Sequence, residues 1–321
     1  MEVRSAINIL FSKFNVNYRV FLYLFVVIVL VLAISVSVIV PSFTAVFKSP
    51  ETAELYSEVR VAFADYLGGS KGFSGVTESV SHLYHKIVDL LNASNATAIF
   101  WVTLVITCFF IRLVMSFSYP AISDIMNNFM SSNMSYGFLS NVLKNAKLCA
   151  KYSFFHTLIT IALDFGLAFA VYGIIKGLFP LIKVFAFAVG LVAAVILFSA
   201  RLTFSAGILP EMIVGEEKSY FAAIRKGLSY TIKYFGKIFG SFCISTFCLY
   251  GIVAVLSVVT FGVAFFVLGA MFVTYVQILQ LVLYYESKSM RYYTDAYTIV
   301  NTAPIEQRID LQEELLEKDD D

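Results

Sequence analysis

Long apolar runs alternate along this chain with charged segments, and six of the runs have the length of a membrane-spanning helix. The lipid core of a bilayer is about 30 Å thick and needs about 20 apolar residues per helix. The runs cover residues 20–40, 98–117, 153–175, 181–204, 238–259 and 263–285, the last two joined at Thr260, Phe261 and Gly262. Backbone polar groups in lipid must be paired within the chain, which continuous runs achieve as helices. The pattern therefore predicts an all-α polytopic membrane bundle with six transmembrane helices.

Residues 41–97 form a long, more polar segment between the first two runs. Apolar side chains recur there at helical spacing in two stripes, the first ending near Leu67 and the second starting at Val76. Glycines mark a break between the stripes: Gly68, Gly69, Gly72 and Gly75. Two such stripes can cover each other, so we expect an extracytoplasmic helical hairpin over this segment.

The segment 205–237 contains a basic amphipathic helix that leads into the fifth run. Its apolar residues recur at three- and four-residue steps: Phe221, Ile224, Leu228, Ile232, Phe235 and Ile238. Basic residues fall between them: Arg225, Lys226, Lys233 and Lys237. A helix with this pattern lies in the membrane interface and attracts anionic headgroups. Residues 118–152 repeat the arrangement, with an amphipathic stretch after Pro120 and then lysines, so both segments are predicted to lie on the cytoplasmic lipid surface.

The composition supports a membrane protein. Hydrophobic residues make up 59% of the 321 residues and charged residues 14%, against roughly a quarter charged in a soluble domain. This excludes a soluble protein, and nucleic-acid binding has no support. The first run has 21 residues, which is longer than the roughly 7 to 15 of a signal-peptide core, so we expect it to be a retained helix.

The basic residues are divided unequally between the two sides of the predicted bundle. Of the 23 lysines and arginines, 17 fall in four segments: 1–19, 112–152, 201–237 and 286–321. Cytoplasmic segments carry such an excess. Both termini are therefore predicted to lie in the cytoplasm, in a multi-pass protein of the cell membrane, plasma or inner, with an acidic cytoplasmic tail over 286–321.

Four polar side chains fall within or at the ends of the predicted spans: Asp164, His156, Arg112 and Arg201. A carboxylate near the middle of a span is costly and faces a partner or a wet cavity. Arg112 and Arg201 are the candidate partners of Asp164, although the long stem of Arg112 can also carry its charge to the interface. A packing role for Asp164 within the bundle is the alternative.

An intramembrane reaction would need a nucleophile with a base, or clustered histidines and acids. His156 and Asp164 are eight residues apart, which is about 12 Å along one helix at 1.5 Å per residue. That separation is too long for a catalytic dyad. We therefore expect that the protein is not an enzyme.

The second predicted helix of the hairpin carries a polar face whose residue types are those of a metal site. Glu78, His82, His85 and Asp89 are spaced four, three and four residues apart. Imidazole and carboxylate groups at helical spacing can converge on zinc, but a solvated polar face accounts for the same pattern. The cysteines show no ligand spacing. We expect no metal and no cofactor.

The two arginines in the spans occur in similar local sequences. Each begins an Arg-Leu pair, with a serine four residues after the arginine and a proline eight or nine residues after it, at Arg112 and at Arg201. An amphipathic segment, a basic lead-in and another run follow in both places. Internal duplication and chance similarity in low-diversity apolar sequence both account for this pattern.

The stretch 209–214, LPEMIV, followed by 221–227, FAAIRKG, resembles a group of bacterial six-span membrane proteins. These are uncharacterised proteins related to the membrane domain of glycerophosphoryl diester phosphodiesterase. In architecture the resemblance extends from Pro120 to Tyr293, and it implies six spans that close on an aromatic patch such as Tyr284-Tyr285. The family's catalytic barrel and its metal-binding acids have no counterpart in this sequence. The long extracytoplasmic hairpin also departs from the family.

Two functions are left open by the sequence. The first is a non-enzymatic role in membrane or envelope organisation or partner docking, with anionic headgroups, a protein partner or a second copy of the chain as the binding partner. The alternative is a transporter or permease component in which Asp164 lines a polar cavity. A water-filled cavity that reaches Asp164 favours transport, and a solid bundle favours the structural role.

Overall fold

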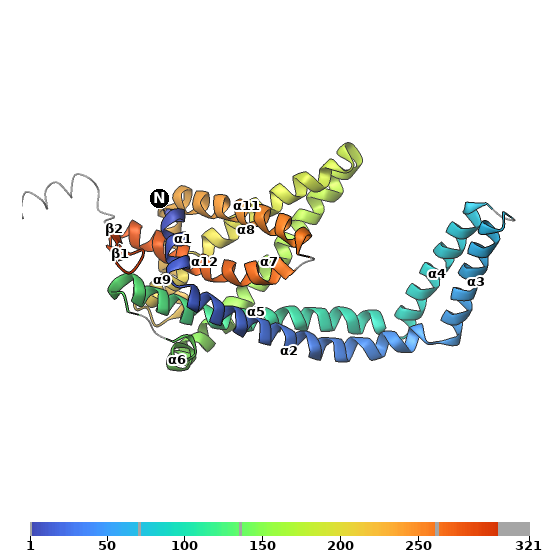
Figure 1. Cartoon of the computed structure of the whole chain (residues 1–321), viewed down its shortest axis with the longest axis horizontal. Helices are drawn as coiled ribbons and strands as arrows, with labels where there is room; N and C mark the ends of the chain where they lie inside the picture. The colour runs from blue at the N-terminus through green and yellow to red at the C-terminus, as the bar shows by residue number, and fades with distance from the viewer. Residues whose placement is uncertain (1, 70–71, 135–136, 261–262, 301–321) are drawn as a thin grey trace, which may run out of the picture. The chain divides into compact units, whose positions relative to one another are not determined.

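The computed structural model describes residues 2–69, 72–134, 137–260 and 263–300 of the chain (Figure 1). The chain divides into two compact units. The core unit comprises Met1–Phe25 and the chain from Arg112 onward, and the hairpin unit comprises Val26–Ile111. Helices α2 (Phe14–Phe47) and α5 (Ala96–Ser132) supply residues to both.

The predicted helical membrane bundle is confirmed. Six segments of the described chain are long and apolar enough to cross a membrane. They are Phe14–Thr44, Ala96–Ser132, Ala146–Ile182, Phe185–Ile213, Phe235–Val259 and Val267–Ser287. The chain is therefore a multi-pass membrane protein.

The other elements follow in chain order (Figure 1). The helices are α1 (Glu2–Ser12), α3 (Pro50–Leu67), α4 (Phe73–Ala93), α6 (Phe138–Lys144), α7 (Ala146–Ile182), α8 (Phe185–Ser205), α9 (Ile208–Ile213), α10 (Tyr220–Lys233), α11 (Phe235–Val259) and α12 (Val263–Ser287). A short antiparallel pair of strands, β1 (Tyr292–Tyr293) and β2 (Ile299–Val300), comes after α12.

Helix α12 is the most enclosed of the six candidate spans. In this unit α7 packs against α8, α8 against α11, and α11 against α12. Five residues of α12 have no exposed surface: Thr274, Ile278, Leu279, Leu281 and Val282. Hydrogen bonds join α12 to α5, since Ser123 Oγ donates to Gln277 Oε1 (3.3 Å) and the Tyr285 hydroxyl donates to Asn127 Oδ1 (2.7 Å). A helix that is apolar all round is typical of such a central position.

Helix α1 belongs to the packed core unit and is fixed there by charge. The ammonium group of Lys237 on α11 lies 2.8 Å from Glu2 Oε1 and 2.9 Å from Glu286 Oε2. Burial by itself would raise the pKa of Glu2, but several hydrogen bonds, of which that from Lys237 has the largest effect, together outweigh it and lower the pKa to about 2. Lys237 therefore pairs with two carboxylates of the protein, and its place on the lipid surface stays a prediction.

Helix α5 does not end at Pro120, where an interfacial helix was expected to begin. It continues to Ser132, and the apolar face expected on the lipid is buried inside the core unit: Ile122, Ile125, Met126, Phe129 and Met130. A proline removes one backbone donor but is tolerated in a spanning helix when neighbouring groups compensate. The segment 118–152 thus consists of the end of α5, the short α6 and the start of α7.

Helix α10 packs by a different face from its predicted apolar stripe. Its buried residues are Tyr220, Ala223, Gly227, Tyr230 and Thr231. A glycine is needed for this packing, because a Cβ on Gly227 would lie 2.7 Å from the backbone carbonyl carbon of Gly207. Phe221 and Ile232 of the stripe are 62% and 67% exposed. The described chain therefore leaves the apolar stripe partly uncovered.

In the hairpin unit, α3 and α4 pack against each other as the two stripes predict. Ser49 caps α3 by accepting a hydrogen bond from the Thr52 amide (3.3 Å), and Pro50 occupies the first helical turn. Leu55 and Val76 are buried. Several other members of the stripes stay exposed: Tyr56, Phe63, Leu67, Val80 and Tyr84. The stripes therefore cover each other only in part.

Two expected features lie on residues that the structure does not describe. They are the middle of the turn at Phe261 and Gly262 and the acidic end of the tail, 301–321. Thr260 is described, and its hydroxyl accepts a hydrogen bond from the Ala264 amide (2.9 Å). Helices α11 and α12 are therefore joined by a side-chain cap at this end.

Candidate functional site

An ion cluster within the spans joins three helices of the core unit. It consists of Asp164 on α7, Arg112 on α5 and Arg201 on α8. Asp164 Oδ1 lies 2.9 Å from Arg201 Nε, and Asp164 Oδ2 lies 3.3 Å from Arg201 Nη2 and 3.7 Å from Arg112 Nη2. The sequence offered the two arginines as candidate partners, and the carboxylate contacts both.

The arginines of the ion cluster are largely buried. The side chain of Arg201 is 6% exposed and that of Arg112 is 19% exposed. Thr160, one turn before Asp164, accepts a hydrogen bond from Arg112 Nε (3.3 Å) and donates one to the His156 carbonyl (2.7 Å). The charge of Arg112 is therefore paired within the bundle. Charges in a span are stable only when they are paired in this way.

His156 lies among tyrosines. Its ring stacks on that of Tyr152, with centroids 4.7 Å apart and planes 17° apart, and its Nδ1 is 3.4 Å from the Tyr220 hydroxyl. The Tyr119 ring meets it edge-on at 6.1 Å. Among the described residues, no hydrogen bond or ion pair joins His156 to Asp164. His156 thus belongs to an aromatic packing group beside the ion cluster.

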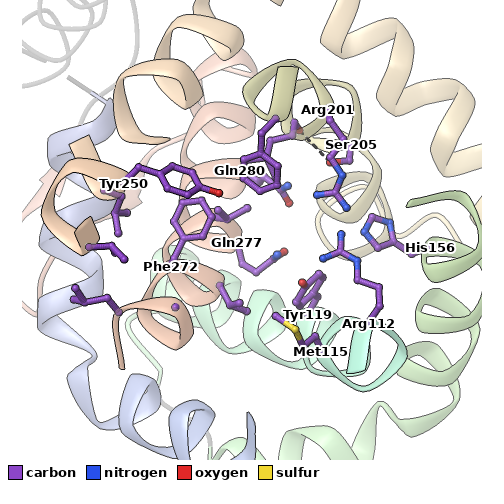
Figure 2. Close-up of a pocket in the computed structure, with 18 of the residues that line it drawn as sticks. Arg112, Met115, Tyr119, His156, Arg201, Ser205, Tyr250, Phe272, Gln277 and Gln280 are labelled. Carbon is purple, nitrogen blue, oxygen red and sulfur yellow. Dashed lines mark hydrogen bonds between the residues drawn. The ribbon is translucent and has the colours of Figure 1, made fainter. Parts of the chain in front are cut away.

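A cavity of about 260 Å³ adjoins the ion cluster (Figure 2). Side chains from α5, α7, α8, α11 and α12 line it, and Arg112 and Arg201 are among them. In Figure 2, Arg112 and His156 lie on one side of the cavity and Tyr250 and Phe272 on the other. The cavity is therefore lined by five membrane-spanning helices and has a cationic side.

Most of the other lining side chains are apolar or aromatic. Phe198, Tyr250 and Phe272 form an aromatic group, in which the ring centroid of Phe198 lies 6.4 Å from that of Tyr250 and 6.3 Å from that of Phe272. The guanidinium carbon of Arg201 is 5.6 Å from the centre of the Phe198 ring. Asp164 does not line this cavity. The expected polar cavity around Asp164 is thus replaced by a mainly apolar cavity that the two arginines reach.

Two glutamines of α12 also line the cavity, and the sequence analysis missed both. Gln277 is 3% exposed and Gln280 is 5% exposed. Gln277 Oε1 accepts the hydrogen bond from Ser123, whereas Gln280 has no hydrogen bond to another described residue. Buried amides need partners, so Gln280 offers unused polar groups to a molecule in the cavity. Their spacing of three residues, which puts them on one face of an apolar helix, was the available signal.

A basic groove lies along α10 and shares no residue with the cavity. Its basic side chains are Arg225, Lys226, Lys233 and Lys288. Lys226 Nζ lies 2.7 Å from Glu217 Oε2, and this hydrogen bond lowers the pKa of Glu217 and raises the pKa of Lys226. Of the residues predicted to face headgroups, Arg225 and Lys233 are exposed and make no ion pair within the described chain.

The hairpin residues considered for zinc lie on the exposed face of α4. In the part of the chain that the structure describes, no group of three or more His, Cys, Asp or Glu side chains is placed to hold a metal ion. Glu78, His82, His85 and Asp89 are all exposed. His82 Nδ1 lies 3.3 Å from Glu58 Oε2 on α3. The described structure thus gives these residues solvent exposure and one side-chain contact to α3.

Comparison with known proteins gives no match among family models, curated proteins or solved structures. The resemblance of 209–214 and 221–227 to bacterial six-span proteins stays a prediction. The function is therefore inferred from the geometry of the ion cluster and the cavity.

Proposed function

We propose that this protein is a transporter or permease component whose solute site is the cavity beside the ion cluster. One observation carries the proposal: Arg112 and Arg201, both paired with Asp164, line a cavity among membrane-spanning helices. Charged side chains in spans are rare and mark solute or ion pathways where they face a cavity. A packing role alone accounts for the ion pairs but leaves the cavity unexplained.

The composition of the lining also favours a binding site over a packing defect. Empty cavities in proteins are apolar throughout, whereas small-molecule sites combine an apolar wall with a few placed polar groups. This cavity has the second composition, with Arg112, Arg201, Gln277 and Gln280 set in an apolar wall. It has five helices around it, so a bound molecule contacts most of the spans of the core unit.

Flux into reconstituted vesicles tests the proposal. The solutes are a panel of radiolabelled carboxylates, phosphate esters, amines and neutral alcohols, and the key variant is Gly269→Leu. Gly269 lines the cavity, and a Cβ there meets no atom within 4 Å. Leucine therefore fills space without a backbone clash. Gly251→Leu on α11 is the matched control, because the space around its Cβ is equally open and it does not line the cavity.

We expect at least one solute to enter through the unaltered protein. Overfilling a site costs roughly 1–3 kcal/mol, so Gly269→Leu should lower that flux by about tenfold or more. Gly251→Leu should leave it unchanged. Equal leakage of every solute with and without the protein, or equal flux through both glycine variants, would contradict the proposal.

A second candidate function, docking of the 205–237 segment on an anionic membrane surface, has support in α10. The apolar side chains of Phe221 and Ile232 are exposed, and so are the cations of Arg225 and Lys233. Each basic residue near an anionic surface contributes about 1 kcal/mol of attraction. The two candidates are compatible, because the groove and the cavity use different residues.

Protease protection tests this second candidate. The variant carries Arg225→Glu and Lys233→Glu, and the control carries Arg60→Glu, an exposed residue of the hairpin unit. In vesicles with anionic lipid, the charge reversal should speed cleavage of the 205–237 segment severalfold, and the control should not. In zwitterionic vesicles all three proteins should be cleaved alike. Unchanged protection of the reversed variant in anionic vesicles would exclude headgroup docking.

A further inference from the structure

The ion cluster carries more positive charge than its carboxylate cancels. Guanidinium groups stay protonated in proteins, so Arg112 and Arg201 bring two positive charges against a single negative charge on Asp164. None of the described residues that line the cavity is acidic. The other ionisable side chains of the lining supply no negative charge: His156, Tyr119, Tyr152 and Tyr250. At least one unit of positive charge is therefore left without a counter-charge at the cavity.

Arg112 also has hydrogen-bond donors to spare. A guanidinium group has five N–H donors. Arg112 donates through Nε to Thr160 and directs Nη2 towards Asp164 at the long distance of 3.7 Å. No other described residue takes up its remaining N–H groups, and the side chain lines the cavity. These donors are available to a molecule in the cavity.

The shape of the cavity limits the size of that molecule and requires two kinds of surface. In Figure 2, Gln277 and Gln280 lie between the side that carries Arg112 and the side that carries Tyr250 and Phe272. The volume of about 260 Å³ is slightly below the roughly 300–1,000 Å³ of small-molecule sites. A whole phospholipid does not fit this space. A molecule that fills it has one polar end and a short apolar body.

We propose that the cavity binds a small amphiphilic anion, whose carboxylate or phosphate head meets Arg112 and Arg201 and whose apolar body lies against the aromatic group. This inference rests on the proposed function, because it takes the cavity as the solute site. Carboxylate and phosphate oxygens share the chemistry in question, since both match the planar donor pairs of a guanidinium group. A single negative charge on the solute balances the excess charge of the ion cluster.

The same charge balance disfavours the other solute classes. A cationic solute would add to positive charge that is already unpaired among largely buried side chains, where ions without a partner are destabilised. A neutral solute of the same shape would use the apolar wall but leave the arginine donors unsatisfied. An anion both balances the excess positive charge and accepts hydrogen bonds from the arginine donors.

Equilibrium binding of radiolabelled octanoate to the full-length protein in nanodiscs of neutral lipid tests this inference. Octanol and octylamine carry the same apolar body with no charge and with a positive charge. Octyl phosphate separates a need for any oxyanion from a need for a carboxylate, and inorganic phosphate shows whether the apolar body is required. We expect saturable octanoate binding that octyl phosphate displaces. Octanol, octylamine and inorganic phosphate should compete at least about tenfold more weakly.

Substitution of Arg112 isolates the charge from the shape of the site. Arg112→Gln keeps the shorter pair between Arg201 and Asp164 (2.9 Å) and leaves the ion cluster without net charge. Octanoate affinity should fall by about tenfold or more, while octanol affinity should change little. Arg112→Lys keeps the charge without the planar donor pair. Its octanoate affinity should lie between those of the unaltered protein and of Arg112→Gln. Gly269→Leu should weaken every probe, and Gly251→Leu should weaken none.

The outcomes separate this inference from the proposed function. Octanol binding as tightly as octanoate, with both lost in Gly269→Leu, overturns the anion preference and keeps the cavity as a solute site. If octanoate binds equally well to the Gly269→Leu variant, it binds outside the cavity, and the inference is overturned. Flux of another solute without any octanoate binding also overturns it, while supporting transport. Octanoate binding in the cavity without flux of any solute supports the inference and contradicts transport.

Discussion

At the scale of single residues, the stability of the ion cluster depends more on Asp164 than on either arginine. Asp164→Asn leaves two positive charges without a counter-ion, whereas Arg112→Gln leaves a neutral pair between Arg201 and Asp164. Breaking a buried ion pair costs about 3–5 kcal/mol, and we expect less for Asp164→Asn because its side chain is 37% exposed. Thermal unfolding in detergent should therefore show a larger loss for Asp164→Asn than for Arg112→Gln.

The double variant provides the control for this explanation. When Asp164→Asn and Arg112→Gln are combined, one of the two unpaired charges is removed. The double variant should then be more stable than Asp164→Asn alone, by about 1–2 kcal/mol, as coupled neighbours in one network commonly are. If the stability losses of the two single variants simply add in the double variant, Asp164 and Arg112 are not energetically coupled. The ion cluster would then not act as one electrostatic network.

The sequence identified the charged members of the candidate site but not its neutral members. Asp164, Arg112 and Arg201 stand out because a charge in a span is costly and therefore needs a reason. Gln277 and Gln280 have no charge, and the cost of an amide in a span is smaller, so they were passed over. The cavity itself depends on how five helices pack, and the order of residues along one helix carries no information about that packing.

At the scale of elements, the contact between α9 and α10 depends on two glycines. A Cβ on Gly227 would lie 2.7 Å from the backbone carbon of Gly207, and a Cβ on Gly207 would lie 2.5 Å from the carbonyl oxygen of Gly227. Both neighbours are backbone atoms, so neither can rotate away. Gly227→Ala should therefore push the two helices apart, at a cost of about 1–3 kcal/mol, which thermal unfolding in detergent measures.

Gly236→Ala is the matched control for this prediction. Gly236 lies on α11 with no atom within 4 Å of its ideal Cβ position. Alanine favours a helix over glycine by about 1 kcal/mol, so this variant should be equally stable or more stable. A Gly227→Ala protein with an unchanged unfolding temperature would show that α9 and α10 can move apart without cost.

The helical period of α10 was predictable, but the face it buries was not. In a soluble protein, the apolar stripe of an amphipathic helix points into the core. Here the buried face carries Ala223, Gly227 and two tyrosines, and the stripe with Phe221 and Ile232 stays exposed. In membrane proteins small residues mark helix contacts, because lipid is as apolar as a leucine side chain. The small residues of α10 were thus the better guide to its packing.

At the scale of the whole molecule, the number of spans and the all-helical class were predictable because both depend on run length alone. With six spans, the two ends of the chain lie on the same side of the membrane, because an even number of crossings returns the chain to the side where it began. Seventeen of the 23 lysines and arginines lie in the segments assigned to one side, and that side is expected to be the cytoplasm. Reporter fusions at the two ends should therefore both show a cytoplasmic location.

A third reporter, inserted in the loop between α3 and α4, should show the opposite compartment and serves as the control. Ends in opposite compartments would mean an odd number of crossings. The segment Val267–Ser287 would then be the first to examine, because 72% of its most apolar window is buried inside the protein. A helix enclosed by protein can be apolar without meeting lipid.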